Sequence, residues 1–565
     1  MNKFKKLKLL FGVILLTAIT SCITDPNLSE TESQSKREDW IKLGKKLENP
    51  YSIKNMRLAL QNLKVKKTSS VSRIALIDQE FSIEPNYLYV EFQPQTEAEE
   101  AVLKQDSSVV LFDYPLDYEF TDEVLDSRPA LSANQVPNYY SAIKIDSETA
   151  SEAHYETLEQ LYIPEEDPYF GSQLQKSQKI SANKEVLLEQ LLDEAFKLTG
   201  NKRVDSQPKT STSARLIFGT RWWPNGNITI YDEVAGANKP VVGAQVLIRQ
   251  WFTVRQGITD ANGNFSTSSV RGSARYIIQW ERYNYSIRNG SLFQAELRGP
   301  VKKDEAWNYT INSGSGDSDD RYHALIHQAA HDFYYGHRFG LISPPMNNHI
   351  YSFGRQGQIK IAARETAPWG ILSSYSHIRS DLTYSLAPQI HIKAWGRPSD
   401  QVYGTTIHEL SHALHSVLDR GSYDNIVRDA FFNNTSAVKN RNRRLLETWP
   451  TTVEIMMTLD RYRTQFNVPN YSVYQNTTLN NNQRITIAAE NHYTSGGFDM
   501  IDDFNQSVIF NNQFPIDRVN GYTLKQLEQS LIGARYWSQW KDNVKNKYDN
   551  PTEIFLDELF NNWQD

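Results

Sequence analysis

Cysteine is nearly absent from this sequence, whose 565 residues contain only Cys22. One cysteine excludes an intrachain disulfide and a thiolate metal cluster, so a transition-metal site in this chain has to use histidine and carboxylate ligands. Long apolar runs are missing as well. After the N-terminal stretch, no uncharged apolar run reaches the ~20 residues that a membrane-spanning helix needs, and we expect the mature chain to be soluble.

A strong positive charge is the third absence. The chain has 60 Lys and Arg against 66 Asp and Glu, which gives a net charge of −6 at pH 7. Removal of residues 1–21 as a signal would take away their lysines and bring the net charge to about −10. Nucleic-acid binding needs a basic surface that neutralises phosphates. We therefore expect no nucleic-acid partner.

The N-terminus has the form of a secretion signal. Positive charges lie between Lys3 and Lys8, and a short apolar stretch runs from Leu9 to Ile19. The signal ends in Ile-Thr-Ser before Cys22. This ending resembles the bacterial lipobox, where the chain is cut before a cysteine that carries lipid. The alternative is a generic signal with an incidental cysteine.

The lipobox resemblance implies a lipid anchor on Cys22 and a place in the bacterial cell envelope. Ile23, rather than an aspartate, follows the cysteine, which argues against retention at the inner membrane. We expect an outer-membrane lipoprotein on the periplasmic or the surface face. Residues 1–21 would be removed, and the polar residues 22–37 would form a tether.

Composition and periodicity divide the rest of the chain into three domains and predict a multidomain α+β fold. Residues 38–210 predict an N-terminal α+β domain without a catalytic constellation. Its clearest elements are a strand at 87–92, a helix at 96–103, a strand at 108–112 and a helix at 183–199 that ends at Gly200. Residues 301–565 are mainly helical and finish with amphipathic helices between 524 and 563.

Residues 214–300 consist of short β-rich runs divided by turn signals, which predicts a β-sandwich. The order of the runs resembles the carboxypeptidase-regulatory-like β-sandwich, which implies a structural accessory domain. Two motifs carry the resemblance, a strand with Gly243, Ala244 and Val246 and a turn with Thr259, Asp260, Gly263 and Phe265. A calcium loop at this turn is disfavoured, because Arg271 stands where an EF-hand loop has its glutamate.

The run Thr405–Leu418 (TTIHELSHALHSVL) carries the main chemical signal. Its apolar residues recur at helical spacing, so His408 and His412 lie on one helix face and can converge on a metal ion. Glu409 leans over the same site and can deprotonate a metal-activated water. This HExxH motif predicts a zinc site. His415, seven residues after the first histidine, either lines the cleft or packs in the protein.

A catalytic zinc needs a third protein ligand and an open position. The metzincin pattern HExxHxxGxxH fails, because His415 and Leu418 stand where its glycine and third histidine belong. Downstream, residues 447–454 (ETWPTTVE) lead into an apolar helical run, and Pro450 suits the first turn of a helix.

The two motifs together resemble the gluzincin metallopeptidases, in which a glutamate on a later helix completes the HExxH site. In their aminopeptidase branch a second glutamate follows seven residues after the first. The resemblance covers roughly residues 390–510 and implies a zincin-like metallopeptidase domain at 301–565. It makes Glu447 the third ligand and Glu454 a carboxylate that orients a ligand, and a shifted register would exchange their roles. Thr448 and Pro450 replace the usual glycine and alanine.

Zinc peptidases also benefit from a donor to the developing oxyanion, which gluzincins take from a downstream helix. The segment 492–498 offers Tyr493 first and His492 second, next to a glycine pair that lets backbone approach. The run 327–331 (HQAAH) copies the histidine spacing but has Gln328 in place of the base. We expect it to form a structural helix beside the active helix.

The resemblance implies a zinc-dependent peptidase that acts on extracytoplasmic proteins or glycoproteins. We expect endopeptidase action, since the exopeptidase signature Gly-x-Met-x-Asn is absent. Residues 389–395 predict a strand whose edge an extended peptide could join. The alternative is a surface-binding lipoprotein with a structural or vestigial zinc, and the intact Glu409 argues against it.

Overall fold

The computed structural model describes residues 42–69, 81–95, 97–120, 126–127, 137–147, 153–171, 178–201, 221–289, 293–312, 319–345, 357–364, 373–375, 388–469, 471, 492–505, 507 and 515–563. The expected signal at 1–21, Cys22 and the tether at 22–37 lie outside these residues. Within the described ranges, no helix is both long enough and apolar enough to cross a bilayer.

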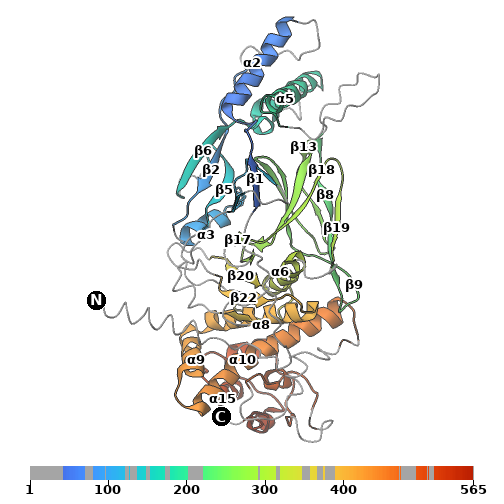
Figure 1. Cartoon of the computed structure of the whole chain (residues 1–565). Helices are drawn as coiled ribbons and strands as arrows, with labels where there is room; N and C mark the ends of the chain where they lie inside the picture. The colour runs from blue at the N-terminus through green and yellow to red at the C-terminus, as the bar shows by residue number, and fades with distance from the viewer. Residues whose placement is uncertain are drawn as a thin grey trace, which may run out of the picture.

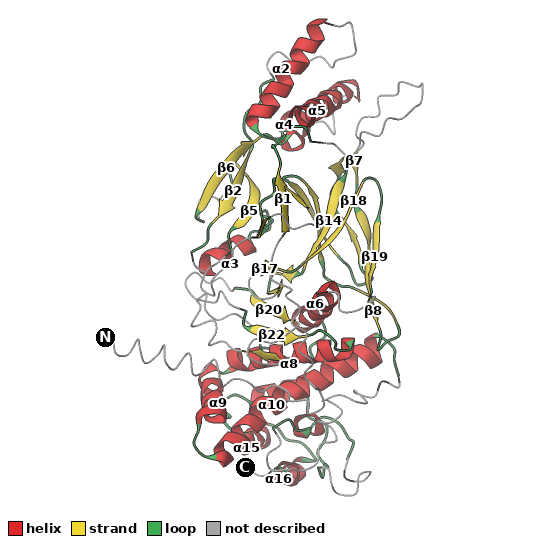
Figure 2. Cartoon of the chain, viewed as in Figure 1, coloured by secondary structure: helices red, strands yellow, loops and turns green. Residues whose placement is uncertain are grey.

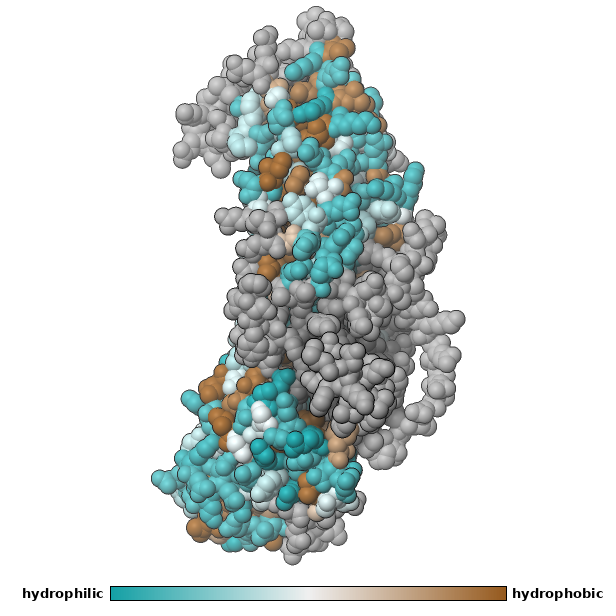
Figure 3. Space-filling model, turned by 90° about the vertical axis from the view of Figure 1, so that its left-hand side faces the viewer, coloured by the Kyte–Doolittle hydropathy of each residue, from teal (hydrophilic) through white to brown (hydrophobic). Residues whose placement is uncertain are grey.

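The described residues form an elongated protein with a mixed α+β fold, which confirms the predicted fold class. An N-terminal α/β region lies at one end, a strand-rich region in the middle and a helical C-terminal region at the other end (Figures 1 and 2). On the face in Figure 3, hydrophilic residues predominate in the upper and lower parts, and smaller apolar groups are scattered among them there.

Among its described residues, the N-terminal region contains two antiparallel sheets of three strands each. The first has the order β5-β2-β6, from β5 (Tyr139–Lys144), β2 (Tyr87–Phe92) and β6 (Tyr155–Leu161). The second has the order β3-β1-β4, from β3 (Tyr118–Phe120), β1 (Lys42–Lys46) and β4 (Asp126–Ser127). The helices are α2 (Ile53–Ser69), α3 (Glu97–Gln105), α4 (Pro168–Gly171) and α5 (Gln178–Leu198), with a 3-10 turn at Pro164–Glu166.

Most local predictions for this region are confirmed. The strand at 87–92 is β2, and the helices at 96–103 and 183–199 are α3 and α5. Gly200 follows α5 with a φ of +69°, a left-handed conformation that glycine adopts at helix ends. The strand predicted at 108–112 is wrong. Asp106 accepts hydrogen bonds from the amide and hydroxyl of Ser108, which holds a turn there, and Phe112 forms only a single bridge.

In the described part of the strand-rich middle region, two sheets contribute apolar side chains to one buried core. One has the order β11-β10-β14-β18, from β11 (Thr253–Ile258), β10 (Gln245–Gln250), β14 (Ala274–Gln279) and β18 (Glu296–Lys302). The other has the order β12-β8-β19 with β9 beside β8, from β12 (Asn264–Ser266), β8 (Asn225–Asp232), β19 (Trp307–Ile311) and β9 (Ala237–Pro240). A short pair, β7 (Arg221–Trp222) and β13 (Val270–Arg271), completes the region.

A third sheet joins the middle region to the C-terminal helices. Its order is β15-β16-β20-β22-β21, with β17 beside β16. The strands are β15 (Glu281–Arg282), β16 (Tyr285–Asn289), β17 (Phe293–Gln294), β20 (Ile359–Arg364), β21 (Ser373–Tyr375) and β22 (Ile390–Lys393). The strand predicted at 389–395 therefore exists as β22. The prediction that this strand has a free edge is wrong. It pairs with β20 on one side and β21 on the other.

The C-terminal region is built around helix α8 (Ser399–Leu418), which contacts α6 (Asp319–Tyr335) and α10 (Ser436–Leu459). Figure 1 shows α8 between the third sheet and α10. The remaining helices are α9 (Arg420–Phe432), a π-helical segment (Asp460–Gln465), α12 (Gly496–Asp499), α14 (Leu524–Ser530), α15 (Trp537–Lys547), a 3-10 turn (Glu553–Phe555) and α16 (Leu556–Asn561). The last helices confirm the amphipathic ones expected between 524 and 563.

Helix α10 differs from the sequence prediction in where it begins. Pro450 was expected in a first turn, but the helix starts at Ser436 and continues through the proline. Proline has no N–H to donate inside a helix. Two side-chain hydrogen bonds span that interruption: the hydroxyl of Thr451 donates to the carbonyl of Glu447, and that of Thr452 donates to the carbonyl of Thr448.

Candidate metal centre

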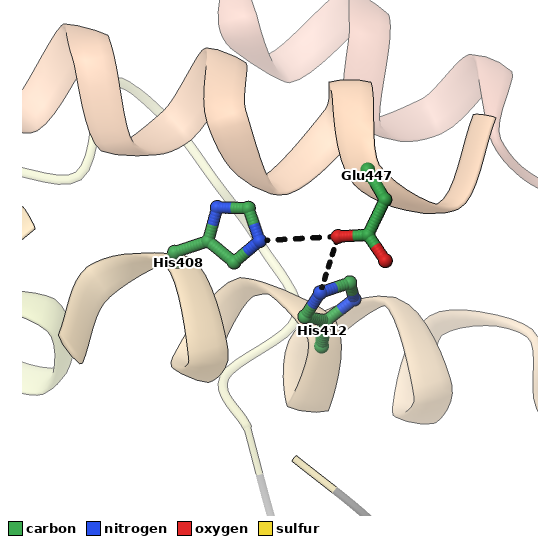
Figure 4. Close-up of side chains that lie close together, drawn as sticks. All are labelled: His408, His412 and Glu447. Atoms are coloured by element: carbon green, nitrogen blue, oxygen red, sulfur yellow. Dashed lines mark hydrogen bonds and ion pairs between the residues drawn. The ribbon is translucent and has the colours of Figure 1, made fainter. Parts of the chain in front are cut away.

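Two long helices deliver the candidate metal ligands. Helix α8 carries His408 and His412 one turn apart, and Glu447 comes from the middle of α10, which packs along α8. Figure 4 shows both imidazoles directed from α8 toward the carboxylate that descends from α10. The three side chains are buried, and one ligand atom from each lies within 4.8 Å of those from the other two. The group could therefore hold a metal ion.

The spacing of the ligand atoms fits a tetrahedral ion better than hydrogen bonds. Glu447 Oε2 lies 3.4 Å from His408 Nε2 and 3.4 Å from His412 Nε2, whereas N–H···O hydrogen bonds normally measure about 2.7–3.2 Å. Zinc binds imidazole nitrogen and carboxylate oxygen at about 2.0–2.2 Å, so two ligands of one tetrahedral ion stand roughly 3.3–3.6 Å apart. Both separations match that edge length, so the donor set fits zinc in chemistry and in spacing.

Electrostatics link the same three side chains. Burial lowers the pKa of His408, but the neighbouring carboxylates of Glu447 and Glu454 outweigh it and raise that pKa to about 10. Burial raises the pKa of Glu447, but the two imidazoles outweigh it and hold that pKa well below its usual range. Burial lowers the pKa of His412. The carboxylate is thus ionised and draws positive charge toward itself, as a metal-ligand position requires.

Glu454 and Glu409 flank this group. Nδ1 of His408 donates to Glu454 Oε2 over 3.0 Å, and such a bond would leave Nε2 as the atom that faces the two other ligands. A carboxylate behind a metal-binding histidine commonly fixes its tautomer and ring orientation in this way. Glu409 is fully buried, and its charge is among those that raise the pKa of His408.

The two candidate oxyanion donors lie in the segment that packs on α10. The ring of Tyr493 lies 6.1 Å from that of His408, measured between centroids. His492 is half-buried, and its Nδ1 has no hydrogen-bond partner among the described residues. Burial, followed by the charge of Arg443, lowers the pKa of His492 to about 4, so its imidazole is neutral near pH 7. The structure thus brings Tyr493 next to a candidate ligand.

The contact between α10 and this segment includes features that the sequence did not reveal. Thr448 Oγ1 lies 2.9 Å from Thr494 Oγ1. A Cβ on Gly497 would stand 2.0 Å from Thr452 Oγ1, so only glycine permits this approach. The glycine pair had predicted a close backbone approach, whereas no sequence signal marked the two threonine positions as partners.

His415 of α8 and His327 of α6 belong to the core. His415 is fully buried against Tyr423, 5.1 Å between ring centroids, and it packs rather than lining a cleft. On α6, His327 uses both ring nitrogens, with Nδ1 3.1 Å from Tyr285 Oη and Nε2 3.0 Å from the Val242 carbonyl. Helix α6 packs against α8, which confirms the predicted position of the HQAAH helix beside α8.

No protein-family model, curated protein or solved structure matches the chain. The structure itself provides a buried group of His408, His412 and Glu447 in a helical C-terminal region, and this group could hold a metal ion.

Proposed function

We propose that the chain is a zinc-dependent peptidase that hydrolyses protein or glycoprotein substrates outside the cytoplasm. The observation that carries the proposal is the position of Glu447 Oε2, at 3.4 Å from the Nε2 atoms of both His408 and His412. The buried carboxylate of Glu409 follows the first of these histidines directly. A metal held only for structure has no need of that carboxylate.

Each side chain has a role in this proposal. His408, His412 and Glu447 would hold the zinc ion, and Glu454 would orient the first of them through its hydrogen bond. When bound, zinc polarises a carbonyl group and lowers the pKa of water toward ~7.

The remaining roles concern protons and charge. Glu409 would take a proton from the attacking water as the water oxygen joins the scissile carbonyl, and would pass that proton to the leaving amine as the C–N bond breaks. Tyr493, or alternatively His492, would donate a hydrogen bond to the developing oxyanion. The 6.1 Å between the rings of Tyr493 and His408 favours Tyr493.

The proposal also covers the type of peptidase, the accessory domain, the mode of cleavage and the membrane anchor. The site is of the gluzincin type, and residues 214–300 form an accessory domain of the carboxypeptidase-regulatory-like type. The absence of the exopeptidase signature favours endopeptidase action over exopeptidase action. An extended substrate would join β21, because among the described strands of that sheet it is paired on one side only, with β22. Lipid on Cys22 would anchor the protein to the outer membrane.

A second candidate function is a surface-binding lipoprotein with a structural or vestigial zinc. The observation that favours it is the burial of the ligands, with His408, His412 and Glu447 each exposed by 4% or less. In addition, a groove of about 860 Å³ between the N-terminal and middle regions is lined by side chains of both charge signs, among them Lys45, Glu119 and Arg275.

One experiment separates the two functions. The purified full chain and a Glu409→Gln variant are analysed for zinc and incubated with unfolded proteins and glycoproteins. The peptidase predicts equal zinc in both proteins, internal cleavage by the parent and none by the variant. Cleavage by both proteins, or by neither while zinc is bound, would favour the binding protein.

A further inference from the structure

A second group of potential metal ligands lies away from the histidines. Asp499 at the end of α12, Asp502 three residues later and Asp517 before α14 each offer an oxygen within 4.8 Å of the other two. Two oxygens bound to one calcium ion at about 2.3–2.6 Å stand at most roughly 5 Å apart. The three carboxylates are thus close enough to share one cation.

Backbone contacts bring the two carrying segments together. The amide of Gly521 donates to the carbonyl of Ile501, and the amide of Tyr522 donates to the carbonyl of Met500. The amide of Asp517 also donates to Asn505 Oδ1, over 3.3 Å. The carboxylates are therefore positioned by the fold rather than by chance proximity of mobile side chains.

One oxygen of the group has no hydrogen bond to explain its burial. Asp517 is only 3% exposed, and its Oδ1 accepts the amide of Val519 over 3.0 Å. Its Oδ2 is buried without a hydrogen-bond partner among the described residues. A buried polar atom without a partner is costly, and a bound ion is one recognised way to satisfy it. The burial of this atom without a partner is independent of how close the three carboxylates lie to one another.

The nearest basic residue in sequence does not neutralise the group. Arg518 directs its guanidinium to Glu558 and the ring of Phe555. Burial first, and then repulsion from Asp499, raise the pKa of Asp502 to about 7 and that of Asp517 to about 9. A divalent cation would satisfy the buried oxygen and relieve the repulsion.

We propose that Asp499, Asp502 and Asp517 bind one calcium ion. The donor set is made of oxygen only, which excludes preference for a soft metal, and carboxylates with backbone carbonyls are the usual calcium ligands. The ion would tie the segment 496–502 to the chain before α14. Thr494, just before that segment, packs on Thr448 of α10, the residue after Glu447, and Gly497 within the segment packs on Thr452. The calcium ion would thereby brace the wall of the zinc site that carries Tyr493.

Calcium binding can be tested without reference to peptidase activity. The full chain, zinc-loaded and freed of calcium, is titrated with calcium chloride by calorimetry and in thermal unfolding. The variants Asp517→Asn and Asp502→Asn remove single charges with little change in shape. Asp503→Asn is the matched control, since Asp503 is exposed and stands outside the group.

The expected result is one calcium per chain in the parent and in Asp503→Asn, with an affinity of about 10⁻⁴–10⁻³ M or tighter and a melting temperature that rises with calcium. Asp517→Asn should bind at least ten times more weakly. Without calcium this variant should melt at or above the parent temperature, which shows that it folds. No calcium binding by the parent up to roughly 10 mM, or unchanged binding in Asp517→Asn, would overturn the proposal. Zinc content, measured in parallel, reports separately on the histidine site.

Discussion

Helices α6 and α8 pack against each other and carry histidines at the same four-residue spacing. On α6, the Tyr285 hydroxyl and the Val242 carbonyl occupy both ring nitrogens of His327, and burial is the main cause that lowers its pKa to about 3. On α8, a carboxylate from α10 lies 3.4 Å from both His408 and His412.

The contrast teaches that spacing alone does not make a metal site. Two histidines one turn apart lie on one face of either helix. What faces them differs, since the middle region supplies a carbonyl to His327 of α6 whereas α10 supplies a charged carboxylate to both histidines of α8. The facing element, far away in sequence, decides whether the pair becomes packing or a candidate site. Each prediction below alters one side of this comparison.

The largest effect is expected from removing one histidine of each pair. His412→Ala should lose zinc and all zinc-dependent activity, because two ligands bind zinc far more weakly than three. His331→Ala, at the equivalent position of α6, should retain one zinc per chain. Metal analysis of both purified variants tests this. Equal zinc in the two proteins would remove the distinction between the helices.

The next largest effect is expected from replacing the second residue of each motif, which directly follows the first histidine. Glu409→Gln should lower the rate of peptide hydrolysis by about 10²–10⁴-fold with zinc unchanged, the usual contribution of a general base. Gln328→Glu gives α6 the full HExxH pattern, yet it should bind no second zinc, because His327 has its nitrogens occupied. A second equivalent of zinc in that variant would show that the local motif suffices.

The two carboxylates of α10 are expected to differ in how much each contributes to zinc affinity. Glu454→Gln should weaken zinc binding or activity about 10–100-fold, the usual cost of losing a carboxylate behind a metal-binding histidine. Glu447→Gln should cost clearly more, because it removes a ligand. Zinc competition with a chelator measures both. A larger loss in Glu454→Gln than in Glu447→Gln would mean that the two residues exchange roles.

The smallest effect concerns pH and stability. His327 has a folded pKa of about 3 against an ordinary value of 6.5, so between these values the unfolded chain binds a proton that the folded chain does not. The contribution of His327 to the free energy of unfolding of the chain should therefore fall as pH drops below about 6.5. His327→Asn should remove roughly 1.4 kcal/mol per pH unit from that slope while zinc at neutral pH is retained. Chemical unfolding at pH 6.5 and 4.5 measures the slope, and an unchanged slope would contradict the assignment.

Features that depend on neighbouring residues were predictable from the sequence. Local periodicity predicts the strand β2, the helix α5 with Gly200 after it, and the histidine spacing on α8. The mixed α+β class followed from the same patterns.

Features that depend on distant pairing were not predictable. The edge of β22 is covered because β20 and β21 pair with it, and no local pattern reports such a register. The true start of α10 at Ser436 was hidden by Pro450, whose usual place is a first turn. The group of Asp499, Asp502 and Asp517 is formed by two segments whose contact only the fold reveals.

The central claim is that one zinc ion is held by His408, His412 and Glu447. Anomalous diffraction from crystals of the full chain, collected on both sides of the zinc edge, tests it most directly. The account predicts a single strong zinc peak between α8 and α10, about 2.0–2.2 Å from two imidazole nitrogens and from one Glu447 oxygen. The absence of a peak there, or a peak coordinated without Glu447, would contradict it.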